Sequence, residues 1–541
     1  MSGDEAPCRG QEGAGTEVSS LDIWVGVDIG SSSCKAIAFD SDMRTLDAAR
    51  QEYPMLIRTN GWAEHDPCTI LRAVIAVIKQ VLISTEVMDS RVRGIGFSGF
   101  MHSVMGVDRE LNPLTPCLAW ADLRTTQQVD DIRAQADATE LYRRTGCPLH
   151  TTYVPAKLRW LRDNMAGEFG RAWRFMSVKE WVIANLTGVF CCDLGVASGS
   201  GLLNVHDLGW DPLVLDVAGI TPDRLSPLVE PSTILPGMAT NLASSEGLPG
   251  NIPVVIGSSD AALSSIGAGG LVPCRMAAMV GTSAAVRALD REPRFDAGGR
   301  SWCYYAGGGY WVVGGAANNG GNVLRWFRDE FGASTYEQLS REAELAPPGS
   351  GGLLFLPFMA GERAPNWNAD ARGVFFGLNL GHSRRHLVRA IMEGIMFQVT
   401  GIYEVVSGLC GIPSSLRATG GFARSGLWLS IMASVSGVPL DTLPDVEGSA
   451  TGAAALARTA LLGLHGMDWI DECIRPTGRV EPDPSDSQVY RDLYYQYMRI
   501  YRLLKDEFAA IAEYQRYSLL RDGAEVSAPG SGCCEEDTTC R

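Results

Sequence analysis

The chain has 541 residues, of which 46% are hydrophobic and 20% charged, and its net charge is −16 at pH 7. That composition is enough to build at least two globular domains. The negative charge argues against a nucleic-acid partner, because phosphate binding needs clustered Lys and Arg. No apolar run reaches the roughly 18 residues of a membrane helix. With scattered cysteines that lack zinc-site spacing, we expect a cytoplasmic protein with no membrane partner.

The two ends of the chain differ from its middle. Residues 1–20 are polar and Gly-rich and lack the apolar core of a signal peptide, so we expect a disordered leader. We expect residues 511–541 to form a largely disordered tail. Between them, β-rich segments alternate with amphipathic helices, which is typical of an α/β fold. The clearest helix follows His386, where Leu387, Ile391 and Ile395 recur at helical spacing.

The first structured segment, VGVDIGSSSCKAIAFD (25–40), reads as a β-hairpin with a turn of small residues. The turn Gly30–Ser33 exposes backbone N–H groups and hydroxyls at close range, which suits an anion such as phosphate. Asp28 precedes the turn and would hold Mg²⁺ beside the phosphates, often through water. The alternative is that Asp28 caps the turn with side-chain hydrogen bonds. The hairpin alone does not decide between them.

The next candidate is GSSDAALSSIGAG (257–269), in which Asp260 ends an apolar strand and precedes a helix-like segment. A carboxylate there is well placed to take a proton from a bound hydroxyl. The alternative role is a helix N-cap, which Asp commonly fills. A lone GxGxxG at 94–99 is followed by a strand-like FMHSVMGVD, whereas a dinucleotide fingerprint needs a helix there. We therefore expect no dinucleotide site.

A second hairpin, MAAMVGTSAAVRAL (276–289), repeats the plan of the first. Each has an apolar strand, a Gly with Ser or Thr, and a second apolar strand. Two copies some 250 residues apart predict two similar domains that face each other; chance similarity of two hairpins is the alternative.

Further along, GVFFGLNLGHSRRHLVRAIMEG (373–394) resembles the long C-terminal signature of the FGGY family of carbohydrate kinases. The family's N-terminal signature is met in part by YVPAKLRWLRDN, which keeps Lys157 and Trp160 but has Val154 where Pro, Ser or Thr is usual. The resemblance covers about residues 23–504. It implies two actin-like (ribonuclease H-like, ASKHA) α/β domains with an active-site cleft between them: a sugar-binding domain at 21–269 and an ATP-binding domain at 270–510.

The resemblance also implies the roles of residues in the cleft. Asp260 would be the catalytic base and Asp28 would organise Mg²⁺, with ATP as co-substrate. The residues expected at ATP are Gly30, Ser31, Ser32, Ser33, Lys35, Gly281, Thr282, Ser283, Gly320, Gly321, Gly420, Gly421 and Ser425.

Within the family, WADLR, SVKEW and GTSAAVR are most similar to the subgroup that phosphorylates D-gluconate to 6-phospho-D-gluconate. A kinase for xylulose or another polyol is the alternative, followed by a non-catalytic binding protein. Phe100 departs from the glutamine common in the family. The residues expected at the sugar are Met101, His102, Trp120, Asp122, Arg124, Lys179 and Asp260. A homodimer is one option for the assembly, which the sequence does not determine.

A gluconate carboxylate needs a cation or several N–H donors, because an unpaired buried charge is very costly. We assign this role to Lys179 and Arg124, whose alternative is a surface salt bridge. His102 would donate to a substrate hydroxyl; the alternatives for His102 and Trp120 are positions in the core. The segment GERAPNWNADARG (361–373) reads as a surface loop from its composition and lies near the cleft by resemblance, and we leave it out of the expected site.

Overall fold

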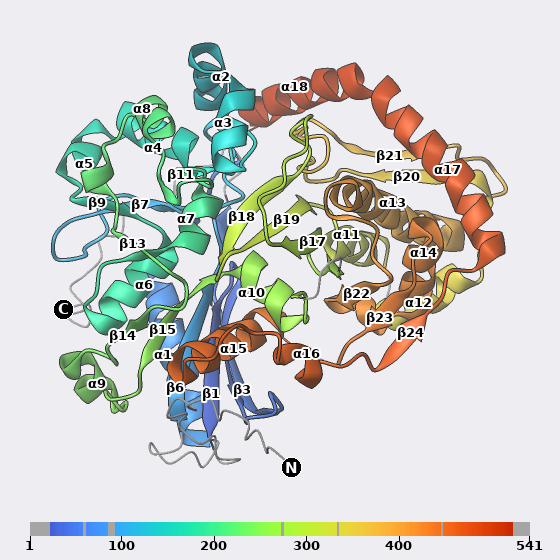
Figure 1. Cartoon of the computed structure of the whole chain (residues 1–541). Helices are drawn as coiled ribbons and strands as arrows, with labels where there is room; N and C mark the ends of the chain where they lie inside the picture. Colours follow the sequence, from blue (N-terminus) through green and yellow to red (C-terminus); the bar gives the residue numbers. More distant parts are fainter. Residues whose placement is uncertain are drawn as a thin grey trace, which may run out of the picture.

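Figure 1 shows the computed structural model, which describes residues 22–57, 61–84, 92–271, 275–332, 335–444 and 447–522. The expected leader, residues 1–20, lies outside this range. Helix α18 (Lys505–Asp522) continues to Asp522, so the tail expected from residue 511 begins inside a helix, and its remainder lies outside the described residues. Among the helices of the described segments, none combines the length and apolar character needed to cross a bilayer.

The first half of the chain is built on a six-stranded sheet with the order β14-β15-β6-β1-β2-β3. The central strand β1 pairs antiparallel with β2 and parallel with β6. The first predicted hairpin is therefore confirmed. The GxGxxG glycines lie inside β6, in agreement with the expectation that they form no dinucleotide turn. The strands are β1 (Ile23–Ile29), β2 (Ser33–Phe39), β3 (Thr45–Glu52), β6 (Val92–Gly99), β14 (Ile234–Leu235) and β15 (Val254–Ser259).

The second half is built on a seven-stranded sheet with the order β18-β19-β17-β16-β22-β23-β24. Strand β16 pairs antiparallel with β17 and parallel with β22, which is the arrangement of β1, β2 and β6 repeated. The second hairpin and the similarity of the two halves are therefore confirmed. The strands are β16 (Met276–Val280), β17 (Ala284–Asp290), β18 (Trp302–Gly307), β19 (Tyr310–Ala317), β22 (Leu416–Thr419), β23 (Leu440–Thr442) and β24 (Gly478–Val480).

Helix α15 (Gly448–Leu462) joins the two halves, because it lies between β23 and β24 of the second sheet in sequence and packs against β1 and β6 of the first. Figure 1 shows it across these strands, beside α10 (Asp260–Gly267). Glycines allow this close approach. A Cβ at Gly26 would stand 1.9 Å from the Ala450 carbonyl oxygen, and one at Gly96 would stand 2.1 Å from that of Ala453. The position of one half against the other is thus set by backbone contact.

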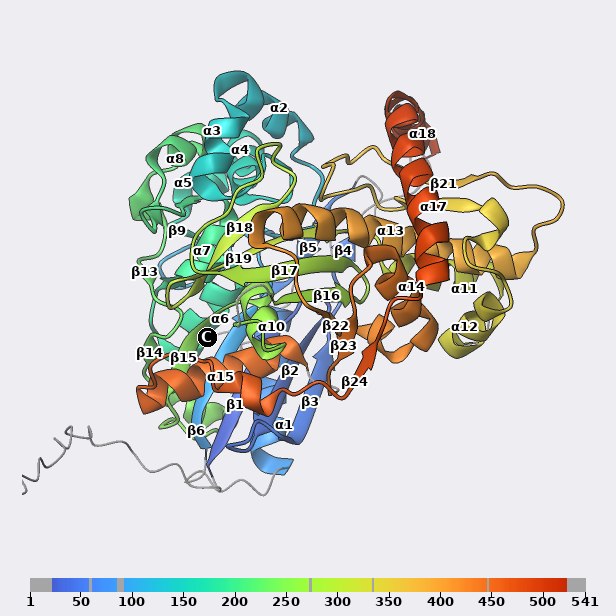
Figure 2. The same cartoon turned by 45° about the vertical axis from the view of Figure 1, so that its right-hand side comes forward.

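The predicted helix after His386 is α13 (Arg384–Cys410), which is buried in the core of the second half. Figure 2 shows it above the strands of the second sheet, close to α17 (Pro484–Leu503). The signature residue Glu393 accepts hydrogen bonds from the Gly349 N–H, the Ser350 hydroxyl, Arg389 and the Tyr490 hydroxyl of α17. This buried carboxylate forms hydrogen bonds with three segments of the chain. The signature residue Glu393 therefore has a structural role in the core.

The other helices surround these sheets. Those of the first half are α1 (Pro67–Ser84), α2 (Thr126–Gln135), α3 (Ala138–Thr145), α4 (Val154–Asn164), α5 (Ala166–Arg171), α6 (Val178–Thr187), α7 (Leu194–Ser200), α8 (Pro212–Ala218) and α9 (Thr240–Glu246). Those of the second half are α11 (Gly321–Phe331), α12 (Tyr336–Glu344), α14 (Gly426–Ser436) and α16 (Ile470–Cys473). Short strands pair as β4 (Leu56–Ile57), β5 (Ala63–His65) and β8 (Cys117–Leu118); β7 (Met105–Val107) and β9 (Arg174–Met176); β10 (Cys192–Asp193) and β13 (Leu228–Val229); β11 (Leu203–Asn204) and β12 (Gly209–Trp210); and β20 (Leu354–Pro357) and β21 (Gly373–Phe376).

Candidate active site

A cavity of about 140 Å³ lies between the two halves and takes its walls from both. The first half contributes the first hairpin turn, the segments after β6 and β8, the residues before α4 and the start of α10. The second half contributes residues of β16, β17, β18 and β19 and the loop that precedes β21. The lining residues from the first half include Ser31, Met101, His102, Trp120, Thr152, Tyr153 and Asp260, and those from the second include Ser283, Arg287, Trp302, Tyr304, Arg363 and Trp367.

Asp260 is the first residue of α10 and faces this cavity. The N-cap of α10 is Ser259, whose side chain accepts a hydrogen bond from the Ala262 N–H, so the cap alternative for Asp260 is wrong. Burial raises the pKa of the Asp260 carboxyl, while the charges of Arg287 and Arg363 oppose that rise. A carboxylate with a raised pKa is a better proton acceptor, which suits a general base.

Asp28, near the end of β1, lies close enough to Asp260 for the two carboxylates to repel each other. Burial raises the pKa of Asp28 to about 6, and the charge of Asp260 is the second cause. The Asp28 carboxylate accepts a hydrogen bond of 2.9 Å from the Ser98 hydroxyl on β6. Within the described part of the chain it accepts none from the Gly30–Ser33 turn, which does not support the turn-cap alternative.

His102 lines the cavity and is held by its backbone and by its ring. Its Nδ1 lies 2.6 Å from the Gly199 carbonyl oxygen. Because a carbonyl only accepts, Nδ1 carries the proton. Burial and the charge of Lys157 keep the pKa of His102 well below its usual value, so the ring is neutral. Its Nε2 is then an acceptor, which reverses the expectation that His102 donates to a substrate hydroxyl.

Lys179 and Arg124, the two expected carboxylate ligands, do not line this cavity. Lys179 forms a buried ion pair of 2.8 Å with Asp193 and donates to the Ser258 carbonyl. Arg124 pairs with Asp122 and Glu64, and its guanidinium lies over the ring of Trp62 at 4.0 Å. Both cations are thus committed to protein carboxylates. Both pairs are buried, so the surface alternative is wrong as well. Asp122 is fully buried beside Arg124, and it does not line the cavity either.

The cations that do face the cavity are Arg287 and Arg363, which the sequence reasoning did not select. Arg287 lies on β17 and donates to the Ser264 hydroxyl at 2.8 Å, and the Arg363 guanidinium lies 5.1 Å from the centre of the Trp120 ring. The Nε atom of each is buried without a hydrogen-bond partner among the described residues. The signals were present, because these arginines lie in GTSAAVR and GERAPNW, both similar to the gluconate subgroup.

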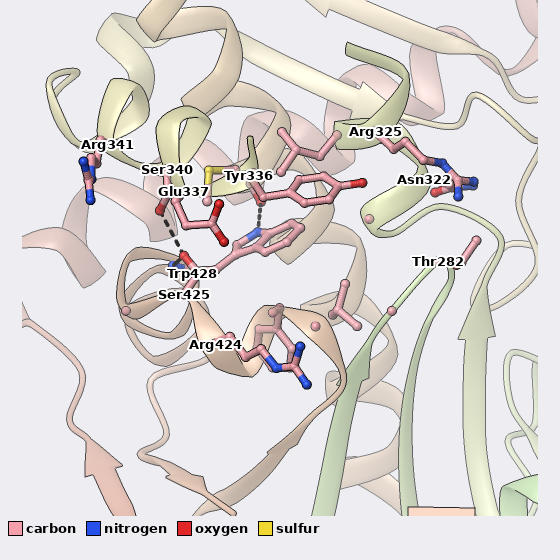
Figure 3. A pocket seen from close by; sticks show the side chains of 18 of the residues that line it. Thr282, Asn322, Arg325, Tyr336, Glu337, Ser340, Arg341, Arg424, Ser425 and Trp428 are labelled. Carbon is pink, nitrogen blue, oxygen red and sulfur yellow. Dashed lines mark hydrogen bonds between the residues drawn. The ribbon is translucent and has the colours of Figure 1, made fainter. Parts of the chain in front are cut away.

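A second, larger pocket of about 540 Å³ lies in the second half alone. Figure 3 shows its walls, which come from the turn after β16, the start of α11, α12 and the start of α14. Five of the residues expected at ATP line it: Gly281, Thr282, Gly321, Gly421 and Ser425. Ser425 caps α14, accepting from the Trp428 N–H, and its hydroxyl lies 3.0 Å from that of Ser340.

Two further glycines of the expected ATP set do not line this pocket, but each directly precedes a glycine that does. Gly420 has φ +86°, and a Cβ there would stand 2.7 Å from the Val280 carbonyl oxygen. A Cβ at Gly320 would stand 2.7 Å from the Ser283 carbonyl oxygen. Only glycine allows these backbone segments to approach each other so closely. The turn Gly281–Ser283 borders both spaces, since Thr282 lines the larger pocket and Ser283 the smaller cavity.

The turn of the first hairpin lies farther from the larger pocket. Ser31 lines the smaller cavity, whereas Gly30, Ser32, Ser33 and Lys35 line neither space. The turn is closed by a hydrogen bond of 3.1 Å from the Gly30 N–H to the Ser33 carbonyl. Lys35 forms a 2.5 Å ion pair with Glu447, at the start of α15.

Two similar halves with a carboxylate-lined cavity between them and an adjoining pocket bounded by glycines are the features expected of a two-domain kinase of actin-like fold. Residues 23–267 match the N-terminal domain of the FGGY family of carbohydrate kinases, and residues 276–461 match its C-terminal domain. The chain therefore belongs to the FGGY family. It is a carbohydrate kinase that uses ATP as co-substrate, as the resemblance implied.

Relatives of known name include gluconokinases, xylulose kinases and a glycerol kinase. A gluconokinase of Bacillus subtilis is 35% identical over 91% of this chain and 98% of its own length, and a xylulose kinase of the same organism is 27% identical over 91% and 99%. Among solved structures, a gluconate kinase from Lactobacillus acidophilus has a TM-score of 0.85 at 30% identity, covering 91% of this chain and 99% of its own. A xylulose kinase from the same organism has a TM-score of 0.86 at 30% identity, covering 91% and 100%.

Proposed function

We propose that this kinase phosphorylates the terminal hydroxyl of D-gluconate and yields 6-phospho-D-gluconate. The observation that carries the proposal is the charge of the cavity. Arg287 and Arg363 bring two guanidinium groups to its wall, each with a buried Nε that lacks a partner, and Asp260 brings one carboxylate. A buried, unpaired N–H of a charged group is costly. A substrate carboxylate would supply the missing acceptor and the missing negative charge.

Xylulose is the second candidate, and the relatives named above support it almost as well as gluconate. A neutral ketose offers hydroxyl and carbonyl oxygens to the two arginines, but with Asp260 as the cavity's one carboxylate it leaves one of the two positive charges uncompensated. A hydroxyl–guanidinium contact is weaker than a charge-assisted pair. The cavity therefore favours a sugar acid over a neutral sugar, and the 35% identity to a gluconokinase favours gluconate among sugar acids.

The reaction follows from the roles of the cavity residues. Asp260 accepts the proton of the terminal hydroxyl while that oxygen forms a bond to the γ-phosphorus of ATP. The bond from that phosphorus to the bridging oxygen breaks, and ADP leaves. Little covalent chemistry is required of the protein, so positioning and charge neutralisation account for most of the catalysis. Ser31 and Ser283, which border the cavity from the two hairpin turns, lie where they would contact the transferred group.

Asp28 also fits a magnesium ion held together with ATP. Burial and the charge of Asp260 raise the pKa of Asp28, so a cation held by Asp28 would relieve the repulsion between the two carboxylates. Among the described residues, no group of three His, Cys, Asp or Glu side chains forms a site by itself. This agrees with Mg²⁺ chemistry, in which one or two carboxylates share the ion with phosphates and water. The ion would neutralise charge on the phosphates.

A coupled ADP-release assay with Mg-ATP tests the proposal. The panel is gluconate, xylulose, glycerol, ribulose and no sugar. We expect release that requires gluconate. Release with xylulose and not with gluconate would contradict the proposed substrate and leave the family assignment in place.

A further inference from the structure

The N-terminal family signature contains a lysine, Lys157, to which the proposed reaction and the recognition of the substrate carboxylate assign no role. Lys157 lies on α4, and its side chain is completely buried. Its hydrogen-bond partners are three backbone carbonyl oxygens. The Nζ donates to those of His102 at 2.7 Å, Ala119 at 2.8 Å and Thr152 at 2.8 Å. An ammonium group has three N–H donors, and here all three are used.

Each accepting carbonyl belongs to a segment that forms a wall of the sugar cavity. His102 and Thr152 line it directly, and Ala119 precedes Trp120, which also lines it. The Trp120 carbonyl in turn accepts from the Thr152 hydroxyl at 3.2 Å. These segments are far apart in sequence, and in the described contacts the one ammonium group bonds to all three.

One of the three segments needs support of this kind. His102 has φ +70°, a left-handed conformation that is rare and unfavourable for residues other than glycine. Such a conformation persists only where its surroundings hold it. The bond from Lys157 to the His102 carbonyl holds the backbone, and the bond from Nδ1 to Gly199 holds the ring.

We propose that Lys157 is a positioning residue for sugar binding: its ammonium group fixes the three wall segments that carry His102, Trp120 and Thr152. The inference rests on the kinase activity of the family and holds for whichever sugar the enzyme accepts. A planar Arg fork cannot direct its donors to three carbonyls around one point, and an apolar residue supplies none.

The charge state of Lys157 gives the proposal a second consequence. Burial lowers the pKa of Lys157 to about 7; Asp122 and Cys117 act to raise it, and Arg124 acts to lower it. A neutral amine has two N–H donors, so deprotonation leaves one of the three carbonyls without its bond. Sugar binding should therefore weaken as pH rises through about 7. The nucleotide pocket shares none of these three carbonyls.

The first test compares Lys157→Met, which keeps the length of the side chain, with Arg162→Met on the same helix. Arg162 is 39% exposed and pairs with its neighbour Asp163. The sugar is the one that the wild type phosphorylates fastest, so a wrong sugar assignment does not affect the result. We expect Lys157→Met to raise KM for the sugar at least about tenfold and KM for ATP less than about twofold. The control should change neither. An unchanged KM for the sugar, or an equal rise of both constants, would overturn the proposal.

If Lys157→Met does not fold, a second measurement on the wild type tests whether Lys157 supports sugar binding. In the wild type, KM for the sugar and KM for ATP are measured between pH 6.5 and 8.5, a range chosen around the lowered pKa. We expect KM for the sugar to rise with pH while KM for ATP stays constant. A KM for the sugar that does not change over this range would overturn the proposal.

Discussion

The two spaces of the cleft differ in size, in the halves that line them and in the ligand that we propose for each. The sugar cavity holds about 140 Å³, takes its walls from both halves and contains buried charges of both signs. The nucleotide pocket holds about 540 Å³ and belongs to the second half, and it combines glycine backbone and apolar side chains with charged side chains such as Arg325, Glu337 and Arg424. In the proposed function, the two arginines of the sugar cavity select the sugar by its charge, whereas the glycines let the nucleotide approach the backbone closely. Substitutions in one space should alter the kinetics of one substrate and leave those of the other.

The largest effect is expected at Asp260, the proposed base, which lines the sugar cavity. Asp260→Asn removes the proton acceptor and keeps the shape of the side chain. We expect kcat to fall about a thousandfold, with both KM values changed little, because general bases contribute about 10²–10⁴. The assay is ADP release at saturating sugar and ATP.

The matched control is Asp130→Asn, which changes an exposed carboxylate of α2 that pairs with Arg133. It should retain wild-type kcat. A folded Asp260→Asn enzyme with more than about a tenth of the wild-type kcat would contradict the assignment of the base.

A smaller effect is expected from filling the nucleotide pocket. A Cβ at Gly421 meets no protein atom nearer than 4.0 Å, so the protein tolerates a side chain there while the pocket loses volume. We expect Gly421→Val to raise KM for ATP about tenfold and to leave KM for the sugar unchanged, which amounts to a loss of about 1.4 kcal/mol of ATP binding.

Gly408→Val serves as the control, because its position on α13 is exposed and open. It should change neither constant. If Gly421→Val raised KM for the sugar instead, the assignment of ATP to the larger pocket and of the sugar to the smaller cavity would be wrong.

The smallest effect is a change of stability with pH. The pKa of Asp28 is raised from 3.8 to about 6 in the folded protein, so folding favours its protonated form. The stabilising contribution of that proton is fully present below the unfolded pKa and is lost as pH rises through about 6. Asp28→Asn should therefore raise the Tm by a few degrees at pH 7.5 and by less at pH 5.

Activity should show the opposite dependence, since the Asp28 carboxylate is needed at the phosphates. The kcat of the wild type should fall as pH drops through about 6. Differential scanning calorimetry of the wild type and of Asp28→Asn at pH 5 and pH 7.5 measures the predicted difference in Tm. An Asp28→Asn protein with a lower Tm than the wild type at pH 7.5 would show that the ionised carboxylate stabilises the fold.

Much of this molecule could be predicted from its sequence because the relevant signals are local. Each hairpin is a strand, a small-residue turn and a strand, and both appear as expected. The helix after His386 follows from apolar spacing. The pairing of charges could not be predicted in the same way. Lys179 pairs with Asp193, and Arg124 pairs with Glu64. These are tertiary contacts, and a local sequence pattern does not predict them.

The two cavity arginines could not be predicted for a related reason. Arg287 and Arg363 come from the second half of the chain, whereas the residues expected at the sugar all lie in the first half, as Asp260 does. Arg363 also lies in a polar, Pro-containing segment that reads as surface loop from composition. Its place in the cavity depends on how the two halves meet, which in turn depends on helix α15 against Gly26 and Gly96.

The central claim is that the two arginines recognise a carboxylate, and one selectivity ratio tests it most directly. D-Glucitol is the neutral polyol in which a CH₂OH group replaces the carboxylate of gluconate. The kcat/KM ratio of gluconate to glucitol is measured for the wild type, for Arg363→Met and for the exposed control Arg385→Met. We expect the wild type and the control to share a high ratio and Arg363→Met to lower it about a hundredfold, the loss typical of a buried charged hydrogen bond. An unchanged ratio in a folded Arg363→Met enzyme would contradict the account.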